Sequence, residues 1–190
     1  MLPGVTVQRP VPGSVRIVTR DELLNVLSGL RLARIAGQRA PHKPLLVLWL
    51  LGRFAATGST SVTYADLEEP VSGLINEFGP DVTSQARARE RAAMPFVHLE
   101  RTLWDPRDSD GRPIASDAPE RGNRLRAQGA RGRLRPEVET LLADPGTLAD
   151  AARLLLERYF DPTQAGRVGG AVGWDLTAPA GTVSAPARPA

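Results

Sequence analysis

The sequence has 190 residues and contains no cysteine, one lysine and two histidines. Without cysteine, the chain cannot form a disulfide, use a thiol nucleophile or bind zinc through sulfur. The two histidines, His42 and His98, supply too few ligands for a zinc site or for a nuclease site of the His-Asn-His type. We therefore expect no bound metal and no cofactor.

Catalytic motifs are also missing. The sequence has no glycine-rich phosphate loop of the G-x-x-x-x-G-K type and no G-x-S-x-G element. Acidic neighbours such as Glu68 and Glu69 are typical of a solvated helix face, and a nuclease that uses carboxylates alone is the remaining catalytic interpretation. We expect no catalytic residue in this chain, which would then not be an enzyme by itself.

Long apolar runs are absent as well. The stretch from Leu45 to Leu51 falls far short of the roughly 20 residues that a membrane-spanning helix needs. The first residues, LPGVTVQRPVPG, lack the basic and apolar segments of a signal peptide. The sequence therefore predicts a cytoplasmic protein without a membrane partner.

Aromatic residues make up 5% of the chain, so leucine, valine and alanine must fill most of the core. A hydrophobic fraction of 42% suffices for one domain. We predict a single compact helical domain, mainly α with a few short β-strands (α+β), over residues 19–162. Prolines and glycines predict an extended arm at 1–18, with a short strand at SVRIV. Composition predicts a flexible linker or tail at 163–190.

Two helices are predicted in the first third of the chain. The first begins at Thr19, which has capping-box spacing to Glu22, and runs to Gly37. The second has Pro44 in its first turn, where the missing N–H of proline costs nothing. From Leu45 to Ala56 the second helix is apolar nearly all round, which is typical of a helix buried on most sides. It should therefore be the central helix of the domain.

Periodicity and turn residues predict the remaining elements. We expect a short strand at STSVTY, a third helix from about Ala65 to Phe78 and a strand from Phe96 to Trp104. The segment DPRDSDGRP is typical of a turn or hairpin loop. Two helices, PEVETLLAD and GTLADAARLLLERYF, should close the domain.

Arginine carries almost all of the positive charge, and it is concentrated in two segments. One lies at residues 87–91, and the other, at 121–135, contains no acidic residue. Arginine binds phosphate oxygens in pairs through its planar fork. A merely solvated, arginine-rich surface is the alternative explanation. The residues predicted to contact DNA phosphates are Arg87, Arg89, Arg91, Arg121, Arg124 and Arg126.

Two motifs indicate a more specific function. The segment RAPHKPLLVLWLLGR, residues 39–53, contains the only lysine, Lys43, between a histidine and a proline, and MPFVHL follows at residues 94–99. PHKP with its leucine run, MPF and the closing helical segment together resemble the DNA sulfur-binding domain of McrA-like type IV restriction endonucleases. Those enzymes act on phosphorothioate DNA. The likeness covers roughly residues 20–163.

The resemblance implies a pocket for the sulfur of a phosphorothioate linkage. The stem of Lys43 would lie along this pocket, and its ammonium would bind the phosphate. Met94 stands where the family usually has tyrosine, and His98 stands where a smaller residue can occur. His42 and Arg39 would contact bases or the groove of the DNA. The pocket residues implied are Lys43, Pro44, Met94, Pro95 and His98.

Simpler explanations exist for some of these residues. Helix initiation alone accounts for Pro44, and ordinary core packing accounts for Met94. A hydrogen-bonded place in the predicted strand accounts for His98.

The sequence thus predicts a non-catalytic module that recognises phosphorothioate linkages in double-stranded DNA and targets a restriction nuclease. Full-length members of the family carry a separate His-Asn-His nuclease domain, for which this chain has no residues. Its further partner would be a nuclease domain or subunit. Two alternatives remain open: a sequence-specific helical regulator that binds unmodified DNA, and a protein-interaction adaptor whose arginines meet an acidic partner.

Overall fold

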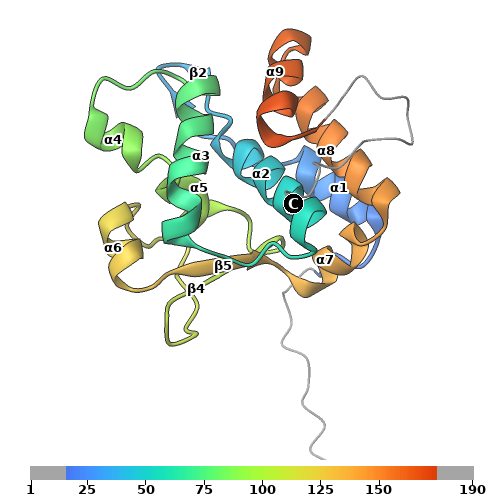
Figure 1. Cartoon of the computed structure of the whole chain (residues 1–190), viewed down its shortest axis with the longest axis horizontal. Coiled ribbons are helices and arrows are strands. Elements are labelled where there is room, and N and C mark those ends of the chain that lie inside the picture. Colours follow the sequence, from blue (N-terminus) through green and yellow to red (C-terminus); the bar gives the residue numbers. More distant parts are fainter. Residues whose placement is uncertain (1–15, 175–190) are drawn as a thin grey trace, which may run out of the picture.

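The computed structural model describes residues 16–174, and these are mostly helical with short strands, as predicted (Figure 1). Residues 1–15 and 175–190, which hold most of the predicted arm and part of the predicted tail, lie outside the described residues. The helices are α1 (Arg20–Ser28), α2 (His42–Thr57), α3 (Tyr64–Phe78), α4 (Gln85–Arg89), α5 (Ala93–His98), α6 (Gly122–Ala127), α7 (Pro136–Leu142), α8 (Pro145–Tyr159) and α9 (Pro162–Val172). The strands are β1 (Arg34–Ile35), β2 (Gln38–Arg39), β3 (Val62–Thr63), β4 (Trp104–Arg107) and β5 (Arg131–Leu134).

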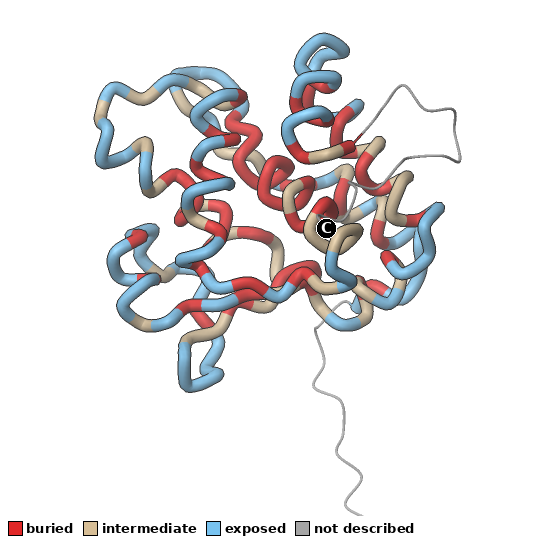
Figure 2. The backbone as a smooth tube through the Cα atoms, viewed as in Figure 1, coloured by how far each residue is buried: buried red, intermediate tan, exposed pale blue. Residues whose placement is uncertain are grey.

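Helix α2 is the central helix, as its apolar sequence predicts. Every residue from His42 to Gly52 is buried except Trp49, which is half-buried. The helix contacts α3, α5, α8 and α9, and Figure 2 shows buried backbone running through the middle of the molecule along it. Because core packing holds α2 on most sides, the first turn of this helix has a fixed position.

The other long helices agree with the predicted ones to within a few residues. Helix α3 begins after Thr63, whose side chain accepts a hydrogen bond from the backbone N–H of Asp66. Helices α7 and α8 occupy the two predicted terminal segments. Within residues 16–174, no helix is both long and apolar enough to span a membrane.

Helix α1 begins as predicted but ends earlier. Thr19 and Glu22 form the capping box, whereas the helix stops at Ser28 and does not reach Gly37. The chain then forms the β1–β2 hairpin, with Ala36 and Gly37 at its turn. Both turn residues have positive φ, 49° and 80°, as a two-residue hairpin turn of the primed type requires. Gly37 therefore marks a hairpin turn rather than a helix end.

The predicted strand from Phe96 to Trp104 is wrong for most of its length. Phe96 to His98 belong to α5, and only Trp104 begins a strand. Strand β4 pairs with β5, which lies in the second arginine segment and was not predicted, and β5 also pairs with β3. DPRDSDGRP forms the predicted loop, closed by a bridge between Arg107 and Pro113. A short apolar segment fits a helix and a strand equally well, and tertiary packing decides between them.

The predicted flexible tail is wrong for residues 163–174. Asp161 caps α9 by accepting a hydrogen bond from Gln164 N at 2.9 Å, and Val168 and Trp174 are buried against the core. Gly52 of α2 allows this packing, because a Cβ on it would lie 2.8 Å from the carbonyl oxygen of Val172. The C-terminal helix is therefore part of the domain.

An aromatic cluster joins the small sheet to the helices. The ring of Phe96 makes edge-on contacts with Tyr64 and Trp104, with ring centroids 5.1 and 5.5 Å apart. Trp104 also donates a hydrogen bond from Nε1 to the carbonyl oxygen of Phe96 at 2.9 Å. The indole ring covers Gly132 of β5, where a Cβ would lie 2.1 Å from the nearest ring carbon. A side chain at Gly132 would therefore displace the tryptophan.

We predict that Gly132→Ala destabilises the fold by about 2 kcal/mol, because overpacking of a close contact typically costs ~1–3 kcal/mol. Denaturant unfolding followed by tryptophan fluorescence measures this free energy. Gly73→Ala is the matched control, since a Cβ on Gly73 in α3 meets nothing within 4 Å and should stabilise the helix by ~0.5–1 kcal/mol. Equal effects of the two changes would contradict the packing described for Trp104.

Candidate functional site

Four of the five proposed pocket residues come from the first turns of two helices that contact one another. Lys43 and Pro44 lie in the first turn of α2, and Met94 and Pro95 lie in the first turn of α5. Pro44 and Pro95 are buried, and Met94 is half-buried. In the first turn of a helix a backbone N–H has no partner within the helix, so proline, which lacks this N–H, fits both positions. The structure thus places the two proline motifs on adjoining helices.

Lys43 is nearly buried and is held by a carboxylate that sequence analysis missed. Its Nζ lies 2.9 Å from Oε1 of Glu100, and the exposed fractions of the two side chains are 8% and 21%. The same Oε1 accepts a hydrogen bond from Arg31 N at 3.0 Å. Oε2 of Glu100 is buried and has no hydrogen-bond partner in the described part of the chain. No local pattern in the sequence marks Glu100 as the partner of Lys43.

His42 lies beneath this site and contacts Arg91. The histidine is 4% exposed, and its Nε2 lies 3.3 Å from a guanidinium nitrogen of Arg91. Burial, together with the positive charge of Arg91, lowers the pKa of His42 to about 4. The imidazole is therefore neutral near pH 7, with Nε2 accepting from Arg91 and the proton on Nδ1. The predicted contact between His42 and DNA stays a prediction, and in this structure the ring has its hydrogen-bond partner inside the protein.

Arg91 is buried, which contradicts the prediction that its side chain is exposed and binds a DNA phosphate. It is 7% exposed and donates hydrogen bonds to the carbonyl oxygens of Ile75 at 3.1 Å and Pro80 at 2.6 Å, and to Oδ1 of Asn76 at 3.2 Å. These contacts join the end of α3 to the first turn of α2 through His42. Arg91 therefore holds the first turn of α2 in place from inside the protein and is not part of the exposed surface.

His98 ends α5 and points to a second carboxylate that sequence analysis missed. Its Nε2 lies 2.5 Å from Oε1 of Glu120, and both side chains are partly exposed. The strand predicted around His98 is absent, but the ring is hydrogen-bonded, as the simpler explanation for this residue expected. Through Glu120, the end of α5 adjoins the segment that enters α6. His98 is thus available at the surface, unlike His42.

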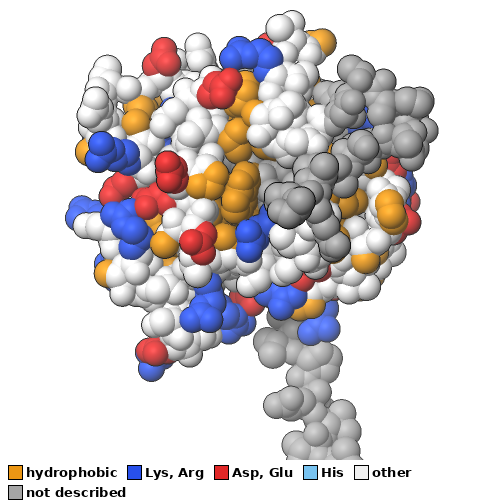
Figure 3. All heavy atoms as spheres, viewed as in Figure 1, with side chains coloured by type: hydrophobic (Ala, Val, Ile, Leu, Met, Phe, Trp, Pro, Cys, Tyr) orange, Lys and Arg blue, Asp and Glu red, His pale blue; other side chains and the backbone are white. Residues whose placement is uncertain are grey.

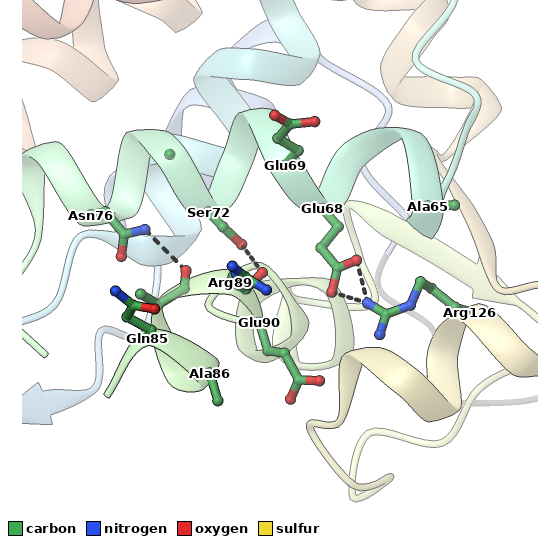
Figure 4. Close-up of a pocket in the computed structure, with 12 residues that line it drawn as sticks. Ala65, Glu68, Glu69, Ser72, Asn76, Gln85, Ala86, Arg89, Glu90 and Arg126 are labelled. Atoms are coloured by element: carbon green, nitrogen blue, oxygen red, sulfur yellow. Dashed lines mark hydrogen bonds and ion pairs between the residues drawn. The ribbon is translucent and has the colours of Figure 1, made fainter. Parts of the chain in front are cut away.

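The two arginine segments meet at one cleft, of about 860 Å³, between α3, α4 and α6 (Figure 4). Arg126 forms an ion pair with Glu68 there, so its guanidinium is already neutralised. Arg89 lies on the opposite wall, which Ser72 and Asn76 of α3 hold through hydrogen bonds to the backbone of α4. Carboxylates of α3 and α4 line the same cleft, which is therefore of mixed charge.

Four of the predicted phosphate-binding arginines are exposed and have no carboxylate within 4.0 Å in residues 16–174. In Figure 3, basic and acidic side chains lie close together on the side of the molecule that carries α3, α4 and α6. Within the described ranges, no group of three or more histidine, aspartate or glutamate side chains is placed to hold a metal ion. The four exposed arginines are Arg87, Arg89, Arg121 and Arg124.

The low pKa of His42 predicts an acid-labile fold. The unfolded chain binds a proton at His42 below about pH 6.5 and the folded chain only below about pH 4, so stability is lost as the pH falls through this window. The full contribution is roughly 3 kcal/mol. His42→Gln keeps an acceptor for Arg91 but does not titrate. Its free energy of unfolding should fall less than that of the wild type between pH 7 and pH 4, and parallel curves would contradict the assignment.

Comparison with known proteins identifies the domain. The family model described as ScoMcrA-like, DNA sulfur-binding domain matches residues 20–177. The sulfur-binding domain of SprMcrA, solved with phosphorothioated DNA, is similar at 24% identity and a TM-score of 0.60, covering 81% of this chain and 95% of that one. The corresponding domain of ScoMcrA gives 23% identity and a TM-score of 0.56, covering 78% of this chain and 97% of that one. No curated protein matches the chain.

The whole ScoMcrA enzyme, a type IV phosphorothioation-dependent restriction endonuclease, is similar only in part. The match has 25% identity and a TM-score of 0.61, and it covers 79% of this chain but 32% of the enzyme. The present chain therefore corresponds to the sulfur-binding domain alone. The resemblance drawn from PHKP and MPF is confirmed, and the chain belongs to the family of ScoMcrA-like DNA sulfur-binding domains.

Proposed function

We propose that this domain binds a phosphorothioate linkage of duplex DNA at the adjoining first turns of α2 and α5, and that it targets a nuclease to the modified site. The observation that supports this most directly is the ammonium of Lys43, which Glu100 holds in the first turn of α2, while buried prolines lie in that turn and in the first turn of the contacting helix α5. An ammonium with two free N–H donors near rigid apolar residues suits a ligand that is anionic as a whole and apolar at one atom.

Sulfur meets that description better than oxygen does. In a phosphorothioate, one non-bridging oxygen of the phosphate is replaced by a larger, more polarisable and less strongly hydrated atom. An oxygen placed against the same apolar walls would lose its water without gaining a donor, which costs about 1–3 kcal/mol. This penalty corresponds to a preference of roughly tenfold to hundredfold for the sulfur-containing linkage.

Each pocket residue then has a distinct role. Pro44 and Pro95 form rigid walls, and the thioether of Met94 offers a soft, polarisable surface in place of an aromatic ring. Lys43 has three N–H donors, of which Glu100 occupies one, so two can reach the oxygens of the bound phosphate. Glu100 orients the ammonium, and His98 lies at the surface end of α5, where it can contact the groove.

The exposed arginines would contact phosphates on either side of the pocket. Arg87 and Arg89 extend from α4, whereas Arg121 and Arg124 lie at the start of α6. Such contacts supply affinity and register but carry little sequence information. His42 and Arg91 support the first turn of α2 from below and do not contact DNA in this proposal.

The nuclease in this proposal is a separate domain or subunit. The chain corresponds to about a third of the ScoMcrA enzyme, and the described residues supply no cluster of metal ligands. A role in the cleavage of modified DNA would place the protein in the cytoplasm.

A comparison of two duplexes tests the proposed function. They have the same sequence, and one carries a single phosphorothioate linkage. We predict at least tenfold tighter binding to the sulfur-containing duplex in gel-shift or fluorescence-anisotropy titrations. Equal affinity for both would favour a regulator of unmodified DNA, and binding to neither would favour a protein-interaction adaptor. Either result would sink the sulfur-reading proposal.

Lys43→Ala should weaken binding to the sulfur-containing duplex by about tenfold to hundredfold, since a hydrogen bond to a charged group contributes about 1.5–3 kcal/mol. Lys43→Arg keeps the charge and serves as the conservative control. Arg121→Ala and Arg124→Ala should each weaken binding less. Thermal unfolding of every variant confirms that it is folded. A larger loss in either arginine variant than in Lys43→Ala would show that the pocket is assigned to the wrong residues.

A further inference from the structure

A second basic pocket lies beside the proposed sulfur pocket, where α1 and α8 end and the β1–β2 hairpin begins. It has a volume of about 340 Å³ and is lined by Ser28, Gly29, Leu30, Leu32, Arg34, Arg39, Arg158 and Tyr159. Three guanidinium groups thus border one small cavity, and no acidic residue lines it. We call it the three-arginine pocket.

Stability does not explain this arrangement of charge. Arg34 and Arg39 are directly opposite one another in the hairpin ladder, where like charges are destabilising. Both are exposed, and neither makes a side-chain hydrogen bond or ion pair with any residue between 16 and 174. Arg158 donates a single, long hydrogen bond from Nε to the carbonyl oxygen of Ser28 at 3.3 Å. The three cations therefore have free donors and lack a counter-charge from the described chain.

The backbone around the pocket is well held. The hydroxyl of Tyr159 donates to the carbonyl oxygen of Leu27 at 2.7 Å and accepts from Leu30 N at 3.0 Å. The hairpin is closed by its two-residue turn and by a hydrogen bond from Ala40 N to Ala33 O at 2.8 Å. A cavity with fixed walls and several free guanidinium donors fits a phosphate, whose oxygens match the arginine fork.

A short hydrogen-bonded path links the three-arginine pocket to Lys43. Leu30 bonds to Tyr159 at the pocket, and the next residue, Arg31, donates its N–H to Glu100, the carboxylate that holds Lys43. Strand β2 also leads directly from Arg39 into the first turn of α2. The charges of Glu100, Arg39 and Arg158 all act on the pKa of Tyr159, which burial raises. The two pockets are therefore neighbours on one edge of the domain.

We propose that the three-arginine pocket binds an unmodified phosphate of the same DNA duplex, near the linkage that carries the sulfur. This inference rests on the proposed function, because it takes the Lys43 pocket as the place where sulfur binds. The contact adds affinity that does not depend on sulfur. It also sets the direction of the duplex across the domain, since two fixed phosphate sites define a line.

The test compares Arg34→Ala and Arg39→Ala with Arg20→Ala. Arg20→Ala is the control because it removes an arginine that is paired with Asp150 at the start of α1, whereas the three-arginine pocket lies at the end of that helix. Each pocket variant should bind both duplexes, with and without sulfur, about three- to tenfold more weakly than the control does. The preference for sulfur should stay unchanged, and the slope of log affinity against log salt should fall by about one.

Duplex length gives a second measurement. Base pairs are removed one at a time from either end of the sulfur-containing duplex. At the length that removes the contacted phosphate, the affinity of the wild type should fall to that of Arg39→Ala, and further trimming should not separate them. Thermal unfolding should show no loss of stability in Arg34→Ala or Arg39→Ala, because each removes a repulsion.

The outcomes separate this inference from the proposed function. If the wild type binds both duplexes equally, the sulfur-reading function fails whatever the arginine variants do. If the wild type prefers sulfur but both pocket variants match Arg20→Ala in affinity and salt slope, only the three-arginine site is overturned. A loss confined to the sulfur-containing duplex would also overturn it, because Arg34 and Arg39 would then act at the sulfur.

Discussion

The ion pair between Lys43 and Glu100 is the interaction on which the rest of the site depends, and it depends in turn on the burial of α2. The ammonium of a lysine that is 6% exposed is stable only beside an opposite charge, because removing an unpaired charge from water costs several kcal/mol. Packing of α2 against four other helices brings Lys43 to that position, and Glu100 meets it from the segment after α5. The core therefore determines where the single lysine can act.

The layer beneath the pair keeps that geometry rigid. His42 is neutral because it is buried, and a neutral imidazole can accept the hydrogen bond of Arg91. Arg91 is anchored in turn to the carbonyl oxygens of Ile75 and Pro80. Two basic residues of the PHKP and arginine motifs thus hold the first turn of α2 in place instead of reaching outward. A selective pocket requires rigid walls. If the walls could move apart, water would enter and hydrate a bound oxygen, and the preference for sulfur would be lost.

Local sequence patterns predicted most of the helices of the domain. They could not predict contacts between residues that are far apart in the sequence. The uninterrupted apolar surface of α2 was sufficient to place that helix, and the capping box of α1 located its start but not its end. Phe96 and its neighbours fit both a helix and a strand, and packing against Trp104 decided for the helix. The Asp161–Pro162 start signal of α9 was present, but the many glycines and alanines after it concealed the helix. Glu100 and Arg91 could not be assigned, because their partners lie 57 and 49 residues away.

In the proposed function, discrimination between sulfur and oxygen and affinity for DNA arise from different parts of this surface. Sulfur differs from oxygen mainly in hydration and size, so apolar walls discriminate and charge does not. Phosphate charge is the same in every linkage, so arginines add affinity to modified and unmodified DNA alike. A domain with many free arginines around one apolar pocket would therefore bind all DNA more strongly, with the same ratio of affinities for sulfur-containing and unmodified linkages. Here Arg126 is neutralised by Glu68 and Arg91 is buried, which limits the number of free cations near the pocket. In the proposed function, carboxylates among the arginines thus limit the affinity for unmodified DNA, and the preference for sulfur comes from the apolar walls of the pocket.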